Sequence, residues 1–146
     1  ASQASHFLSE GKRVVAIDPF YFGESAISTR AALFALLVAA VGDRPLGIEA
    51  SQVAATAHWL KTERQSGPIT VVAIGPRSSL FSLVAAALAP EAIAGLETHQ
   101  AMSSLKEIIE KDLTLDKAPE LFSFGLLAEF DIPQLSALVA SRPLRK

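Results

Sequence analysis

The chain contains no cysteine, which excludes disulfide bonds, thiolate metal sites and a cysteine nucleophile. Charged residues make up only 19% of it, and the formal net charge is −2, so we expect no basic surface that binds nucleic acid. The longest apolar run, Ala31 to Val41, has 11 residues, whereas a membrane-spanning helix needs about 20. The sequence therefore predicts no membrane span.

Metal-site spacing is also absent. The acidic stretch "KEIIEKDLTLDK" lacks the Asp and Gly pattern of a calcium loop, so it reads as a solvated helix face. His6 and His58 stand alone on predicted helices, without a partner at metal-binding spacing. We expect no metal and no cofactor.

What is present is an apolar chain of 146 residues, half of them hydrophobic. This length suits one domain, residues 1–146, and is sufficient to bury a real core. Short apolar runs alternate with helical stretches, which is typical of a parallel sheet covered by helices. Strands are expected at "VVAID" (14–18), "ITVVAIG" (69–75) and "IAGLETH" (93–99), and the chain end allows a fourth strand to start. Helices are expected near 2–11, 27–41, 50–65, 78–89, 103–113 and 132–140.

Three stretches of the sequence carry a resemblance to one protein family. They are "GKRVVAIDPFYFGES", "ITVVAIGPRSSLFSLVAAALAP" and "FGLLAEFDIPQLSALVASRPL". Together they resemble the α/β-hydrolase superfamily, in its acetylxylan-esterase and dienelactone-hydrolase-like branch. The first is similar to the family's fourth strand and the turn after it, the second to the strand, elbow and helix that hold the nucleophile, and the third to the run before the seventh strand. The resemblance implies a partial hydrolase-type three-layer sandwich, whose small, mostly parallel sheet has about three or four strands.

The elbow departs from the family. G-x-S-x-G places a serine two residues after its first glycine, but here that position is Arg77, in Gly75-Pro76-Arg77-Ser78-Ser79. A guanidinium stays protonated and has no lone pair with which to attack an acyl carbon. The resemblance also implies that the family's oxyanion loop, acid and histidine fall outside these 146 residues.

Two serines and a histidine remain as candidate catalytic residues. Ser78 or Ser79 is a candidate displaced nucleophile, although serines at this position often cap a helix. His99 ends a predicted strand, and Glu97 shares its face, so a Ser78–His99–Glu97 arrangement is one hypothesis. The alternative is that the histidine and glutamate only anchor a loop or face solvent.

Arg77, Ser79 and Asp18 are candidate ligand-binding residues. At a helix N-terminus, Arg77 would attract a carboxylate or phosphate; otherwise it pairs with a neighbouring acid such as Asp18 or Glu97. Asp18 is a candidate acid, but in the resembled turn this aspartate holds loop N–H groups. The aromatic residues 20–22 suggest either a sugar-binding surface or packing over the sheet edge.

These patterns lead to three functional hypotheses. The first is a hydrolase-like module without its own triad, which serves as a structural or ligand-binding part of a larger protein. The second is an active carbohydrate or carboxylic ester hydrolase that uses Ser78 with His99, or with residues of another subunit. The third is an anion-binding domain centred on Arg77. We also expect self-association or docking to a parent chain, and the resemblance leans towards secreted or periplasmic proteins.

Overall fold

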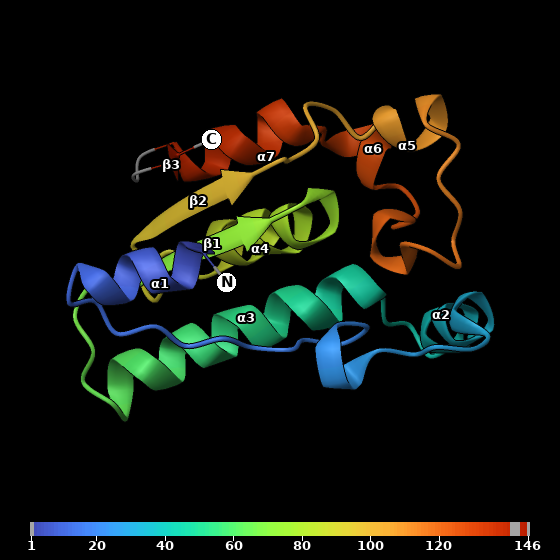
Figure 1. Ribbon diagram of the computed structural model, residues 1–146. Helices are drawn as coiled ribbons and strands as arrows, with labels where there is room; N and C mark the ends of the chain where they lie inside the picture. Colours follow the sequence, from blue (N-terminus) through green and yellow to red (C-terminus); the bar gives the residue numbers. More distant parts are fainter. Residues whose placement is uncertain (1, 141–143, 146) are drawn as a thin grey trace.

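The computed structural model describes residues 2–140 and 144–145, and its secondary structure alternates helices with parallel strands (Figure 1). The helices and short 3₁₀ turns are α1 (Ser2–Ser9), η1 (Gly23–Ser25), α2 (Ala31–Ala40), α3 (Pro45–Thr62), α4 (Pro76–Leu88), α5 (Glu107–Glu110), η2 (Pro119–Leu121), α6 (Leu126–Glu129) and α7 (Ile132–Val139). The strands are β1 (Thr70–Ile74), β2 (Gly95–His99) and β3 (Leu144–Arg145). The chain therefore belongs to the α/β class, as expected.

The sheet is small, open and parallel. β1 pairs with β2 along five residues, from Thr70 opposite Gly95 to Ile74 opposite His99. β3 adds only two residue pairs on the other side of β2, so the strand order is β1-β2-β3. The β-branched run of β1 and the Gly–Pro turn after it form the strand and helix start that the sequence predicts.

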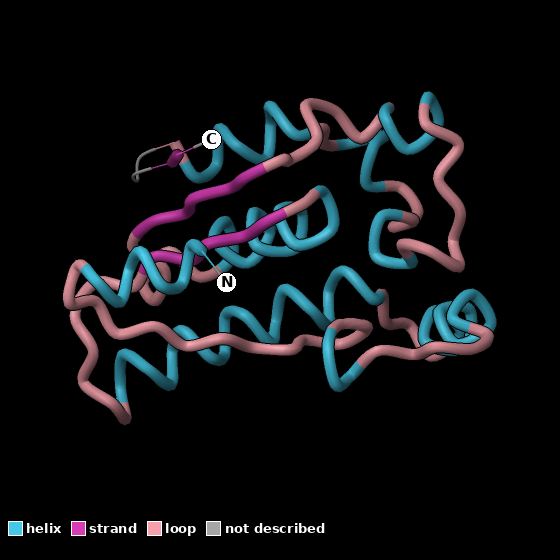
Figure 2. Tube along the Cα trace, in the orientation of Figure 1, coloured by secondary structure: helices cyan, strands magenta, loops and turns pink. Residues whose placement is uncertain are grey.

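The strand predicted at Val14–Asp18 is wrong. This segment has no strand partner among the described residues, and Figure 2 draws the connection between α1 and η1 without a strand. Val15 is 48% exposed and Ile17 is 40% exposed, so the apolar run is not buried between two layers. An apolar composition favours a strand only when a neighbouring edge accepts its hydrogen bonds, and the β1 edge does not do so here.

One face of the sheet carries the core. α4 packs against β1 and β2, with α3 on one side of it and α7 on the other (Figure 1). The core includes Leu80, Ile93 and Leu96, all almost fully buried. On the opposite face Ile74 is 55% exposed, although parallel sheets are usually covered on both faces. The complete hydrolase sandwich is therefore not seen in the described part of the chain.

The helices differ in detail from the prediction. The apolar helix expected from Ile27 starts at Ala31, after Arg30 in a left-handed conformation. The helix expected over 103–113 is reduced to α5, whereas the helix expected near 132–140 is present as α7. Within the described residues no single helix is long and apolar enough to cross a membrane; α2 and α3 meet that test only as a pair bent by 82°.

Candidate functional site

The predicted elbow between β1 and α4 forms a tight strand-to-helix turn. Gly75 takes φ +97°, a conformation that side chains with a Cβ rarely adopt, and Pro76 starts the helix. The sharp backbone turn lies at Gly75, and Arg77, at the position where the resembled G-x-S-x-G motif has its serine, lies in the first turn of α4.

The Arg77 side chain is held by a buried carboxylate. Its Nη2 donates to Glu120 Oε2 at 3.0 Å and its Nε donates to Glu120 Oε1, while the guanidinium carbon lies 4.4 Å from the centre of the Phe22 ring. Glu120 is 0% exposed. Such a two-point pair fixes both position and orientation. Of the two alternatives for Arg77, the structure forms the pair with an acid, but the acid is Glu120 rather than Asp18 or Glu97.

A second acid, Glu49 of α3, is buried beside this pair. Its carboxyl is 0% exposed, and neither oxygen has a hydrogen-bond partner among the described residues. Burial and the nearby Glu120 charge raise the pKa of Glu49 from 4.5 to about 9, although Arg77 opposes the shift. Glu49 is therefore neutral at pH 7, and its proton removes the repulsion that two buried carboxylates would otherwise feel.

Tyr21 is buried near Glu120 and Glu49. Its hydroxyl donates to the Ala31 carbonyl at 2.9 Å, and the residue is 5% exposed. Burial, together with the charges of Glu120 and Glu49, raises the pKa of Tyr21. We call Arg77, Glu120, Glu49 and Tyr21 the acid–arginine cluster.

Ser78 and His99 are not joined by a hydrogen bond in the described structure. The Ser78 hydroxyl donates to the Ile74 carbonyl at 2.7 Å, one helical turn back. His99 Nε2 lies 2.8 Å from Glu97 Oε1 and 3.3 Å from Gln3 Nε2 of α1. The structure thus forms the predicted histidine–glutamate pair, on the sheet face opposite to Thr98, but leaves the serine bonded to its own backbone.

Asp18 holds a loop, as the structural interpretation predicts. Its Oδ2 accepts from the Glu24 N–H at 3.1 Å, and its carbonyl accepts from the Ser25 hydroxyl at 3.3 Å. A Cβ on Gly23 would lie 2.0 Å from the Asp18 carboxyl carbon, so the loop closes tightly around this side chain. Within the aromatic stretch, Phe22 packs edge-on against Phe81 at 5.3 Å between ring centres, which favours packing over sugar binding.

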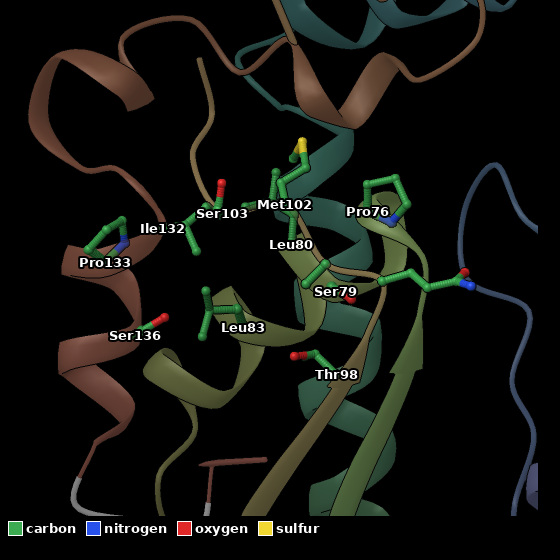
Figure 3. Close-up of a pocket in the computed structure, with 12 residues that line it drawn as sticks. Pro76, Ser79, Leu80, Leu83, Thr98, Met102, Ser103, Ile132, Pro133 and Ser136 are labelled. Carbon is green, nitrogen blue, oxygen red and sulfur yellow. The ribbon is translucent and has the colours of Figure 1, made fainter. Parts of the chain in front are cut away.

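Ser79 lies beside a cavity. Its hydroxyl oxygen is buried and has no hydrogen-bond partner among the described residues, and the residue is 4% exposed. The cavity has a volume of about 370 Å³ and lies between α4, the end of β2 and α7 (Figure 3). Its lining comprises Pro76, Ser79, Leu80, Leu83, Thr98, Gln100, Ala101, Met102, Ser103, Ile132, Pro133 and Ser136. Of these, only Ser79 is among the predicted site residues.

Two parts of this region escaped the sequence analysis. Glu49, Val53 and Ala57 follow one another at intervals of four residues. This spacing places Glu49 on the same helix face as two apolar residues, and it could have predicted the burial of Glu49. Glu120 and the α7 side of the cavity follow irregular chain, where spacing carries no such signal. Among the described residues, no group of three or more His, Asp or Glu side chains is arranged to hold a metal ion.

Comparison with known proteins adds no further assignment: no family model, no curated protein and no solved structure matches the chain.

Proposed function

We propose that this chain is a non-catalytic α/β module whose sequence resembles part of an acetylxylan-esterase-like hydrolase. Its role is that of a structural or ligand-binding part of a larger protein. The observation that carries the proposal is the two-point pair between Arg77 and the buried Glu120. Arg77, the residue in the nucleophile position, links α4 to η2 through this pair, and that role is structural.

The surroundings of the pair support the same conclusion. Arg77 also stacks on Phe22, so its guanidinium contacts protein groups on two sides. The Ser78 hydroxyl donates a hydrogen bond to a backbone carbonyl, so Ser78 lacks the hydrogen-bonded base that a serine nucleophile needs. These contacts also weigh against an anion-binding domain centred on Arg77, because Glu120 already supplies the anion.

Incomplete burial supports a role within an assembly. Leu33, Leu37 and Val41, in α2 and at its end, are 50% or more exposed, as is Ile74 on the sheet face opposite to the core. Exposed apolar groups of this extent commonly mark contact surfaces. Self-association, or docking to the rest of a parent chain, would bury them; light scattering of the purified chain distinguishes the two.

The test of the proposal is chemical labelling. Incubation with a fluorophosphonate followed by mass spectrometry is expected to leave Ser78 and Ser79 unmodified, and p-nitrophenyl acetate is expected to hydrolyse at the background rate. An active serine esterase in a parallel reaction confirms the reagent. Hydrolysis that disappears in Ser78→Ala would overturn the proposal in favour of an ester hydrolase, for which the His99–Glu97 pair is the supporting observation.

A further inference from the structure

We propose that α2 is the interface of a homodimer, in which it packs antiparallel to the α2 helix of a second copy of this chain. This inference rests on the role within an assembly that is part of the proposed function. It names the partner and the orientation of the contact.

The outer half of α2 is entirely apolar. Ala31 and Ala35 lie on the inner side and are buried. The exposed residues recur at intervals of three and four, so they form one continuous stripe along the helix. The stripe comprises Leu33, Phe34, Leu36, Leu37, Ala40 and Val41. Helices that are apolar all round are normally covered on all sides, so the stripe marks a contact surface.

The stripe is held in place by the rest of the molecule. The Tyr21 hydroxyl donates to the Ala31 carbonyl at 2.9 Å, and Asp116 Oδ1 accepts from the Ala32 N–H at 3.1 Å. Figure 1 shows α2 at the end of the molecule away from α1 and β3, so a second helix can approach it. Docking onto a surface that is already ordered costs little conformational entropy.

The charges at the two ends of α2 point to a second copy as the partner. Arg30 precedes the helix and Asp43 follows it, and both are exposed. Neither side chain makes an ion pair or hydrogen bond among the described residues, whereas Arg44 donates to two backbone carbonyls and Asp116 accepts from α2 itself. A surface with one positive and one negative end complements itself when the second helix runs in the opposite direction.

This complementarity also sets the register. Antiparallel packing places Arg30 of one copy beside Asp43 of the other, and the twofold symmetry of the dimer repeats this pair at the far end. Leu33 then lies opposite Ala40 of the second copy. Each helix N-terminus lies beside the C-terminus of the other helix, which the helix dipoles favour. A parallel dimer would instead bring like charges together at both ends.

Sedimentation velocity of the purified chain tests the association. The stripe is small compared with a standard interface, so we expect a reversible dimer whose population rises between about 1 and 300 μM protein. Leu37→Glu places a charge at the centre of the stripe and is expected to weaken dimerisation about a hundredfold or more. Leu138→Glu on α7 is the matched control, because Leu138 is 54% exposed and Leu37 is 57% exposed. It should dimerise as the natural chain does.

Charge reversal tests the orientation. Arg30→Asp or Asp43→Arg alone sets like charges against each other at both ends of an antiparallel dimer. Each is expected to raise the dissociation constant about three- to tenfold, and the variant that carries both changes should restore it. In a parallel dimer, neither single variant would alter the like-charge contacts that are already there.

Cross-linking gives a second measure of orientation, because the chain has no cysteine of its own. Leu33→Cys and Ala40→Cys each introduce one thiol. Mild oxidation should join the two variants efficiently when they are mixed, and should join each variant to itself poorly, because a disulfide needs Cα atoms within about 7 Å. Efficient joining of each variant to itself would indicate parallel helices.

Several results would overturn the inference. They are a chain that stays monomeric throughout, a Leu37→Glu variant that dimerises normally, single charge variants of unchanged affinity, and cysteine variants that cross-link only with themselves. A monomer that floats with phosphatidylcholine vesicles would overturn it in favour of a lipid surface. If circular dichroism shows that Leu37→Glu fails to fold, the charge variants at exposed positions still decide. None of these results depends on ester hydrolysis, so the inference can fail while the non-catalytic assignment stands.

Discussion

Replacing Glu49 by glutamine is expected to stabilise the chain, and to do so more at higher pH. The folded state holds a proton on Glu49 up to about pH 9, whereas the unfolded chain releases it near pH 4.5. Between these values the folded state binds more protons, so its stability falls as pH rises. Glutamine keeps the shape of the protonated acid but has no proton to lose.

The size of the effect follows from the shift. Each pKa unit corresponds to about 1.4 kcal/mol, and pH 7 lies about 2.5 units above the ordinary pKa of Glu49, so Glu49→Gln should add about 3 kcal/mol at pH 7. At pH 5 the same difference should be below about 1 kcal/mol. Below the unfolded pKa it should vanish.

Urea unfolding followed by circular dichroism at pH 5, 7 and 8.5 measures these differences. Glu110→Gln, on the exposed end of α5, is the matched control and is expected to show no such growth with pH. A Glu49→Gln variant no more stable than the natural chain at pH 7, or a difference that stays constant across the pH series, would refute the reasoning.

Three further changes test other parts of the structure. Arg77→Met should lower the free energy of unfolding by about 3 kcal/mol, because Glu120 is left buried and unpaired. Adding Glu120→Gln should restore much of that stability. Urea unfolding measures both variants, and a double variant that loses as much stability as Arg77→Met alone would contradict this. Asp131→Ala should cost about 1–2 kcal/mol, because its side chain caps α7 and accepts from the Leu105 N–H. Desolvation acts to raise the pKa of Asp131, but hydrogen bonds to its carboxylate outweigh this and lower the pKa. The contribution of Asp131 to the free energy of unfolding should therefore be lost only as pH falls below about 4. An unfolding series in acid would check this. Gly75→Ala should cost about 1–3 kcal/mol through its backbone conformation alone, because a Cβ there meets no neighbour. Gly47→Ala, at an exposed position of helix α3, should stabilise by about 0.5–1 kcal/mol, so the two thermal midpoints should move in opposite directions.

Local signals account for the elements that the sequence predicted. β1 and α4 follow from a β-branched run, a glycine and a proline in succession, all of which act within a few residues. The start of α7 follows from Asp131, whose capping box with Gln134 is likewise local. Such features need no knowledge of the rest of the chain.

Long-range pairing accounts for what the sequence did not reveal. The run at Val14–Asp18 has strand composition, but whether it becomes a strand depends on an edge that lies more than fifty residues further along the chain. The partner of Arg77 lies 43 residues away in an irregular stretch, so no spacing rule points to Glu120. The cavity depends on how α7 packs against α4, which is a tertiary property.

The first turn of α4 contacts two different regions, the cavity on one side and Glu120 of η2 on the other. Pro76, Ser79 and Leu83 border the cavity, while Arg77, about a quarter of the circumference round the helix, binds Glu120. A helical turn moves as a unit, so a shift that lengthens the contact with Glu120 also displaces the wall on the other side. Arg77→Met, which removes that contact, is therefore expected to change the shape of the cavity as well as the surroundings of Glu120.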